Sequence, residues 1–252
     1  MRKGVSILGG IAVKLSSIVP WGRSLEEYRA MFALSAADLH GRTLDCGGGP
    51  ASFNAEASAL GTRIVSVDPI YAYSAADIEG RIEDTFDAIM SQARAQADRF
   101  VWTCFADPDV LARARRSAMR RFLADYKAGR QVGRYIAGEL PSLPFADRSF
   151  DLALSSHLLF LYSEHLSLGE HLAGIRELLR VAGEVRIFPL DNLAGERSSH
   201  LAPVCDALRL DGLAVEEVKV GYEFQRGAGS MLRVRHGVLG LPQREPTKWP
   251  AG

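Results

Sequence analysis

The chain has 252 residues, of which 47% are apolar, and its 30 basic residues are balanced by 30 acidic ones. This length allows one domain with a sizeable core, and the zero net charge excludes the bulk attraction that draws basic proteins to nucleic acid or anionic membranes. The three cysteines, Cys46, Cys104 and Cys205, are scattered. They indicate neither a disulfide framework nor a metal site, and they fit a reducing cytoplasmic environment.

The N-terminal segment combines a basic start with a short apolar run, Val5 to Val13. This is the outline of a signal peptide, but glycines and Lys14 interrupt the run and no cleavage site follows it. The run is also shorter than the roughly 20 apolar residues that span a bilayer. We therefore expect an N-terminal arm over residues 1–20, and neither a signal peptide nor a membrane segment.

Two helices are expected before the first strand. Leu25 to Leu34 has helical periodicity and follows Ser24, a residue type that caps helix N-termini, and Ser35 can cap a second helix. Tyr28 lies on the inner side of the first helix. Packing of Tyr28 on the sheet is the favoured interpretation, and contact with a substrate is the alternative.

A strand–turn–helix–strand unit follows. Thr43 to Cys46 and Arg63 to Val67 are expected as strands, with a helix over Ala51 to Leu60 between them. This order is the right-handed crossover from which doubly wound parallel sheets are built. Asp68 and Pro69 come directly after the second strand. An acid at this place can accept hydrogen bonds from both hydroxyls of a ribose.

The turn after the first strand is rich in glycine. Gly47, Gly48 and Gly49 allow a sharp turn and allow a ligand to approach the main chain without meeting a Cβ. A dinucleotide site requires the spacing Gly-x-Gly-x-x-Gly, which this turn lacks. Asp45 precedes the glycines, where an acid repels a pyrophosphate but can face an ammonium group.

The order Asp45-x-Gly47-x-Gly49 resembles motif I of the class I S-adenosylmethionine-dependent methyltransferases, Asp-x-Gly-x-Gly-x-Gly, with Ala51 in place of the last glycine. The resemblance implies that the turn binds the amino-acid end of S-adenosyl-L-methionine and that Asp68 binds its ribose. It also implies a Rossmann-like sheet of about seven strands whose last strand is antiparallel.

A second segment similar to this family begins at Gly138 and reads Gly-Glu-Leu-Pro-Ser-Leu-Pro-Phe, followed by the strand Phe150 to Leu154. The corresponding methyltransferase stretch is Gly-Asp-x-x-x-Leu-Pro-Phe-x-x-x-Ser-Phe-Asp. By that resemblance, Glu139 accepts a hydrogen bond from the adenine amino group and Leu140 offers its backbone N–H to the ring. Glu139 departs from the Asp of that stretch by one additional methylene.

Residues 72–134 form an insert longer than the crossover from the second strand to the next, Tyr135 to Ala137, requires. Apolar residues recur at helical spacing around Ile82 and again around Phe122, so two helices are expected. The first is acidic and the second is basic. Mutual pairing of their charges is the favoured interpretation, and a cap whose arginines attract an anionic substrate is the alternative. We expect the insert to cover the substrate site.

The fourth strand is followed by Ser155, Ser156 and His157, at the sheet edge where ligands gather. We expect Ser155 to contact the cofactor. His157 can remove a proton from an acceptor, with a local role at the start of a short helix, 158–162, as the equal alternative. Tyr162 and His165 are weaker candidates for substrate contacts.

The remaining elements complete the predicted α/β sheet. Ser167 is expected to cap a helix that ends at Gly183, and the later elements are a strand over 184–190, a helix over 200–210, and strands over 213–220 and 230–235. We expect one domain over 1–252 with a tail over 241–252.

The sequence thus predicts a cytoplasmic enzyme that transfers a methyl group from S-adenosyl-L-methionine to a small-molecule acceptor, without a metal. The resemblance favours a small acceptor because Ser155-Ser-His157 stands where enzymes acting on nucleic-acid bases carry Asn-Pro-Pro-Tyr or Asp-Pro-Pro-Tyr. A protein that binds the adenosyl group without catalysis is the alternative, and an NAD-linked oxidoreductase is a weaker one.

Overall fold

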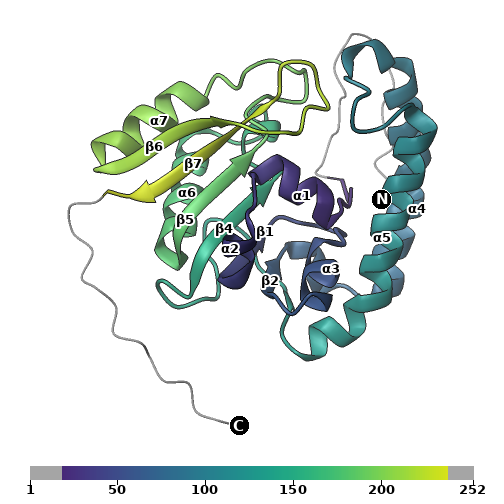
Figure 1. Ribbon diagram of the computed structural model, residues 1–252, viewed down its shortest axis with the longest axis horizontal. Helices are drawn as coiled ribbons and strands as arrows, with labels where there is room; N and C mark the ends of the chain where they lie inside the picture. Colours follow the sequence, from purple (N-terminus) through teal and green to yellow (C-terminus); the bar gives the residue numbers. More distant parts are fainter. Residues whose placement is uncertain (1–18, 238–252) are drawn as a thin grey trace, which may run out of the picture.

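The computed structural model describes residues 19–237 (Figure 1). Of the expected N-terminal arm, residues 1–18 lie outside this range, and so does the whole of the expected tail over 241–252.

The centre of the protein is a seven-stranded sheet in the order β3-β2-β1-β4-β5-β7-β6. Its strands are β1 (Arg42–Cys46), β2 (Arg63–Val67), β3 (Tyr135–Ile136), β4 (Phe150–Ser156), β5 (Ala182–Phe188), β6 (Leu213–Lys219) and β7 (Ser230–His236). The first five strands pair in parallel, and β7 is antiparallel to both β5 and β6. The predicted α/β Rossmann-like sheet with an antiparallel last strand is therefore confirmed.

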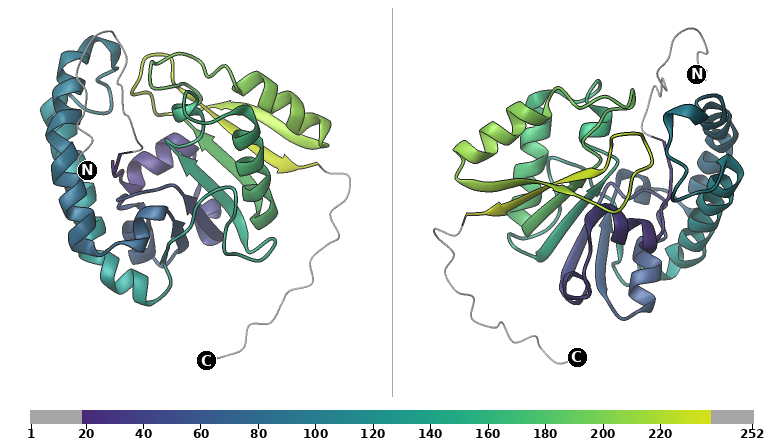
Figure 2. Two further views of the ribbon diagram at one scale, coloured as in Figure 1. Left: turned by 180° about the vertical axis from the view of Figure 1, so that it is seen from behind. Right: turned by 45° about the horizontal axis from the view of Figure 1, so that its top comes forward.

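Helices cover both faces of the sheet (Figure 2). They are α1 (Leu25–Phe32), α2 (Ala36–His40), α3 (Phe53–Ala59), α6 (Leu168–Val181) and α7 (Leu201–Leu210). In β4, Leu152 and Leu154 pack into a core shared with α1 and α3, whereas Ala153 between them packs into a second core shared with α6 and α7. Alternate residues of a strand point to opposite faces, which is why the residues at the centre of this strand, Leu152 to Leu154, are all apolar.

Local sequence accounts for where several helices begin. Ser24, Ser35 and Ser167 each accept a hydrogen bond from the backbone N–H three residues later, and the acid at that position bonds back to the backbone N–H of the serine. This capping box satisfies two backbone donors that the first turn of a helix leaves without partners. The expected caps are confirmed.

The insert forms two long helices, α4 (Ala75–Ala95) and α5 (Pro108–Gln131), which lie side by side, with α5 packed against α3 (Figure 1). Ile82 of α4 and Phe122 of α5 are buried in the same core. Arg116 of α5 lies 3.0 Å from Glu83 of α4. This contact agrees with the favoured interpretation, in which the acidic and the basic helix pair their charges.

Three short 3-10 helices, at Pro69–Ala72, Ala97–Arg99 and Phe160–Tyr162, complete the elements. The last stands where an α-helix over 158–162 was expected. The backbone N–H of Tyr162 is shared between the carbonyls of Leu158 and Leu159 at 3.2 Å each, a mixed geometry common in segments too short to propagate an α-helix.

The end of α6 also differs from the expectation. Gly183 was expected to end the helix, but the helix ends at Val181 and the chain enters β5 directly at Ala182. Ala182 has extended backbone angles and pairs with Phe150 of β4. Sheet pairing therefore replaces the glycine cap.

Candidate active site

A cavity of about 830 Å³ opens at the carboxyl ends of β1, β2 and β4. The residues that follow these strands line it, together with residues of α4 and of the loop between β6 and β7. Its volume lies within the range of about 300–1,000 Å³ that is typical of small-molecule sites. In a sheet of this topology, this edge is where ligands bind.

The glycine turn forms one wall of the cavity. Gly47 and Gly49 have positive φ angles of 74° and 54°, as a sharp turn requires. The backbone N–H of Gly47 donates to the carbonyl of Val67 at 2.9 Å, and the hydroxyl of Tyr71 donates to the carbonyl of Gly49 at 2.7 Å. The turn is therefore fixed to the end of β2, where Asp68 follows.

Asp68 lies on the cavity wall beside the turn, and so does Pro69. Its two carboxylate oxygens accept hydrogen bonds from the backbone N–H groups of Gly49 and Ile70, each at 2.9 Å. Burial raises the pKa of this carboxyl, and the two backbone donors oppose that effect. A carboxylate oxygen has a second acceptor position, so two further donors such as ribose hydroxyls can still be accepted.

Asp45 lies beneath the glycine turn rather than on its ligand side. It is 1% exposed and does not line the cavity. Tyr28 and Ser66 donate hydroxyl hydrogen bonds to its oxygens at 2.9 and 2.8 Å. A Cβ on Gly48 would come within 2.1 Å of its Oδ2, so only glycine allows the turn to rest on the acid. The expectation that Asp45 contacts a ligand directly is therefore corrected: its side chain is buried against the glycine turn and does not line the cavity.

Burial raises the pKa of Asp45 to about 7, although the hydrogen bonds from Ser66 and Tyr28 act in the opposite direction. The nearby charge of Asp68 adds to the increase. The carboxyl group thus lies near the boundary between its neutral and charged forms at physiological pH.

Glu139 and Leu140 lie on the cavity wall that follows β3. Glu139 is exposed, and its carbonyl accepts a hydrogen bond from the backbone N–H of Ser142 at 3.1 Å. Leu140 is half-buried. Both residues, and Gly138 before them, thus share the cavity with the glycine turn and Asp68.

The end of β4 contributes Ser156 and His157 to the cavity, and not Ser155. Ser155 is fully buried within the sheet, and its hydroxyl has no hydrogen-bond partner in the described part of the chain. The expectation for Ser155 is therefore corrected: Ser156 borders the cavity in its place, because alternate residues of a strand face opposite sides. The hydroxyl of Ser156 lies 3.0 Å from Nδ1 of His157.

His157 adopts a positive φ of 53° and donates its backbone N–H to the carbonyl of Phe188 at 2.6 Å. This conformation is uncommon for a residue with a side chain and is stabilised here by the neighbouring strand. Burial, followed by the charges of Arg23 and Arg115, holds the pKa of the imidazole well below its usual value. His157 is therefore neutral at physiological pH.

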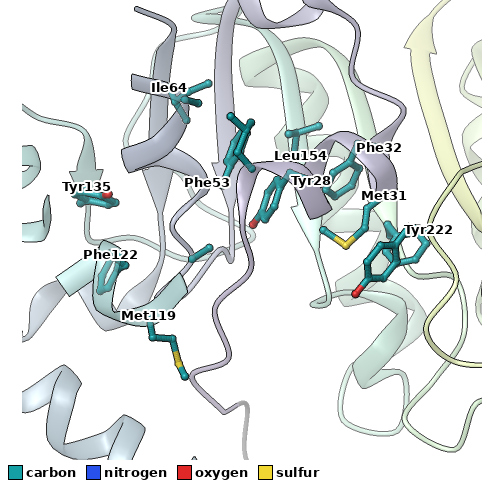
Figure 3. Packing of buried hydrophobic residues seen from close by; sticks show 14 of the residues in the cluster. Tyr28, Met31, Phe32, Phe53, Ile64, Met119, Phe122, Tyr135, Leu154 and Tyr222 are labelled. Carbon is teal, nitrogen blue, oxygen red and sulfur yellow. The ribbon is translucent and has the colours of Figure 1, made fainter. Parts of the chain in front are cut away.

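The three candidate substrate contacts have different positions. Tyr162 lines the cavity. Tyr28 is part of the core, where its ring stacks on Phe53 at 4.1 Å, so the favoured interpretation of core packing applies (Figure 3). His165 is exposed and does not line the cavity. The expected substrate contacts of Tyr28 and His165 are thus corrected.

Several residues of the cavity were not expected from the sequence. Arg23 precedes α1, Arg81 and Thr85 belong to α4, and Tyr222 and Phe224 belong to the β6–β7 loop. No local pattern distinguishes these residues, because they meet only when distant segments fold together.

Between residues 19 and 237, no helix is long and apolar enough to cross a membrane. In the same range, no group of three or more His, Cys, Asp or Glu side chains is arranged to hold a metal ion.

The strand order, the antiparallel β7, and the glycine turn and acid that follow β1 and β2 define a Rossmann-like fold of the class I S-adenosylmethionine-dependent methyltransferase type. The chain belongs to the same family as the uncharacterized protein MJ0045 of Methanocaldococcus jannaschii. The two are 34% identical over 224 residues, which cover 88% of this chain and 98% of that protein. No family model matches the chain.

Solved structures with some similarity include magnesium protoporphyrin IX methyltransferase (ChlM) from Synechocystis PCC 6803 with bound SAM. The alignment has 12% identity and a TM-score of 0.45, and it covers 84% of this chain and 78% of that one. A SAM-dependent methyltransferase from Aquifex aeolicus has 15% identity and a TM-score of 0.42, with 83% and 88% covered. The mitomycin 7-O-methyltransferase MmcR has 16% identity and a TM-score of 0.46, with 84% and 54% covered.

Proposed function

We propose that the protein transfers a methyl group from S-adenosyl-L-methionine to a small-molecule acceptor bound in the same cavity. One observation carries this proposal: the glycine turn, Asp68 and the segment at Glu139 line a single cavity, in which a hydrogen bond joins Gly49 of the turn to Asp68. These are the three segments that the family resemblance assigns to the amino-acid end, the ribose and the adenine of the cofactor.

The residues on the cavity wall fit such a ligand. Asp68 has acceptor positions left for ribose hydroxyls after its two backbone hydrogen bonds. The glycine turn presents backbone without side chains. Glu139 offers a carboxylate, and Leu140 an apolar side chain beside it. The volume of about 830 Å³ is enough for a nucleoside cofactor and a small acceptor together.

When bound, the cofactor supplies a methyl carbon made electrophilic by its attachment to a positively charged sulfur. The protein's own part is to hold the acceptor in line with that carbon, to exclude water and to remove a proton where the acceptor carries one. His157 is neutral, so its ring has a free lone pair for such a proton. Its Nδ1 is near Ser156, so Nε2 is the position that we assign to proton removal.

The cavity supports a small acceptor. Apolar and aromatic side chains from separate segments, including Trp21, Phe188 and Phe224, line it. Sites of this composition bind compact organic molecules and exclude water from the reacting atoms.

The proposal is tested by calorimetric titration with S-adenosylhomocysteine and with NAD. We expect the wild-type protein to bind the first and not the second. In Asp68→Ala, two hydrogen bonds from ribose to a charged group are lost, at about 1.5–3 kcal/mol each, so the affinity should fall by roughly 100-fold or more. Asp87→Ala, in which an exposed acid of α4 is removed, should bind as the wild type does.

Thermal melts of both variants show whether the fold is retained. Equal affinity of wild type and Asp68→Ala would remove Asp68 from the ribose site, and preference for NAD would overturn the cofactor. Incubation with cofactor carrying a labelled methyl group and a panel of small acceptors then separates catalysis from binding alone. Tight binding without any labelled product across such a panel favours the non-catalytic alternative.

A further inference from the structure

Arg23 occupies a particular place on the cavity wall. It lies immediately before α1, and its backbone carbonyl accepts a hydrogen bond from the N–H of Ser52 at 3.0 Å. This bond fixes the segment to the residues that follow the glycine turn. Arg23 lines the cavity together with the turn itself and with His157.

Arg23 forms no ion pair among residues 19–237, although the charge of Glu27 acts on it from nearby. The nearby acid, Glu27, is fully engaged: both of its oxygens accept hydrogen bonds from Arg115 at 2.7 Å, and the hydroxyl of Tyr222 donates to it at 3.0 Å. Arg23 itself donates from Nη1 to the carbonyl of Trp21 at 3.2 Å. Its Nε is buried without any hydrogen-bond partner in this range.

A buried guanidinium nitrogen without a partner is costly, because its hydration is lost and nothing replaces it. Burial and the neighbouring charge of Arg115 lower the pKa of Arg23, and the nearby Tyr222 and Glu27 offset only part of this effect. An anion from outside the chain would relieve both costs. The edge formed by Nε and Nη2 of an arginine matches the two oxygens of a carboxylate.

From this arrangement we propose that Arg23 binds a carboxylate group of a ligand in the cavity. The inference rests on the proposed function for the identity of that ligand: the carboxylate belongs either to the amino-acid end of the cofactor, against the glycine turn, or to the acceptor, beside His157. A phosphate dianion is a poorer fit, since the neighbouring guanidinium of Arg115 is already committed to Glu27.

The test compares Arg23→Gln with Arg29→Gln, which makes the same change at an exposed arginine of α1. Calorimetry is performed with two probes, S-adenosylhomocysteine and 5′-methylthioadenosine, which lacks the amino-acid end. If the carboxylate is that of the cofactor, Arg23→Gln lowers the affinity for the first probe by roughly 10- to 100-fold and leaves the second within about twofold. Arg29→Gln changes neither.

The second arm addresses the acceptor. Benzoate, an aromatic carboxylate suited to the apolar wall, is titrated by saturation-transfer NMR with and without saturating S-adenosylhomocysteine. If the carboxylate is that of the acceptor, wild type and Arg29→Gln bind benzoate and Arg23→Gln does not, while the affinity for both nucleosides is unchanged.

The inference is overturned if Arg23→Gln keeps wild-type affinity in both arms, or if it weakens both nucleosides equally. Failure of the proposed function gives a different result, because the wild-type protein then binds neither nucleoside. In that case benzoate binding by the apoprotein still decides the role of Arg23.

Discussion

The hydroxyl of Tyr28 in α1 donates a hydrogen bond to Oδ1 of Asp45 at the end of β1, with an oxygen–oxygen distance of 2.9 Å. Ser66 of β2 donates to the other oxygen at 2.8 Å. A helix and two strands therefore meet at one buried carboxyl group directly under the glycine turn. The acid that precedes the glycine turn therefore bonds to side chains of the protein itself and lies against Gly48 of the turn.

This position makes Asp45 a source of pH dependence in stability. Its pKa is about 7 in the folded protein and about 3.8 without burial, so between these values the folded state retains a proton that the unfolded state has released. Stability is therefore lost as the pH rises through this window, by an amount on the order of 4 kcal/mol at most.

Asp45→Asn cannot ionise and should lack this loss. We expect the free energy of unfolding of the variant, relative to wild type, to increase by about 2–3 kcal/mol between pH 5 and pH 8. Urea denaturation of both proteins at the two pH values measures it. Parallel dependence of the two proteins on pH would show that Asp45 does not titrate in this range.

The buried ion pair between Glu27 and Arg115 ties α1 to α5, and the side chains are only 10% and 1% exposed. Removing one partner leaves the other charge buried, so Arg115→Met should lower the free energy of unfolding by about 3–5 kcal/mol. Glu27→Gln combined with Arg115→Met should recover much of this loss. Arg116→Met, which breaks an exposed pair with Glu83, should cost no more than about 1 kcal/mol.

The Glu27–Arg115 ion pair should also affect the stability of the protein at low pH. Burial acts to raise the pKa of Glu27, but the charge and hydrogen bonds of Arg115 outweigh it and lower the pKa to about 2. The stabilisation is thus present above the unfolded pKa near 4.5 and is lost as the pH falls toward 2. In Arg115→Met the sign reverses, and denaturation curves between pH 3 and 7 should show the variant gaining stability, relative to wild type, as the pH falls. No difference in slope would contradict the pairing.

His157 should remain neutral throughout the physiological range, because burial and two arginines lower its pKa. Proton NMR of the imidazole signals, with the His157 signal identified by its absence in His157→Gln, should show no titration of this residue at or above pH 6.5. We also expect His157→Gln to bind S-adenosylhomocysteine within about twofold of wild type and to slow turnover by about 100-fold or more once an acceptor is known. A midpoint at or above pH 6.5 would contradict the neutral base.

Local physics allowed much of the fold to be predicted from the sequence. The structure agrees with the predicted strand Arg63–Val67 and with the predicted helix caps at Ser24, Ser35 and Ser167. Both kinds of prediction depend only on residues that lie close together in the sequence. The arrangement of Asp68 beside the glycine turn follows from the crossover itself.

The rest depended on contacts between distant segments. The choice between Ser155 and Ser156 depends on which face of β4 borders the cavity, and a shift of one residue reverses it. Arg23, Tyr222 and Phe224 come from both ends of the described chain and meet only across the folded sheet. The place of Asp45 before the glycine turn could be predicted from the sequence. The direction of its side chain could not, because it is set by hydrogen bonds from the distant residues Tyr28 and Ser66.

An aromatic contact at the cavity connects the insert to the loop between β6 and β7. Phe100, between α4 and α5, stacks on Phe224 of the β6–β7 loop at 4.5 Å with nearly parallel rings, and both line the cavity. The backbone N–H of Val101 donates to the carbonyl of Phe224 at 2.8 Å. Figure 1 shows this loop reaching toward the upper end of the insert. The expected role of the insert as a cover for the site can thus be tested at one side chain.

Phe224→Ala removes the stacked ring but keeps the backbone hydrogen bonds, so the fold should persist while the contact opens more often. We expect faster amide hydrogen exchange over residues 97–105 and 222–228, and an increase of roughly 10-fold in the dissociation rate of S-adenosylhomocysteine with little change in its association rate. Phe145→Ala, which removes a ring packed on Phe150 at 5.0 Å away from the cavity, provides the matched loss of an aromatic contact. Stopped-flow displacement and exchange mass spectrometry measure the two effects. If Phe224→Ala and Phe145→Ala give the same exchange pattern and the same dissociation rate, the contact does not retain the ligand and the insert is not a cover.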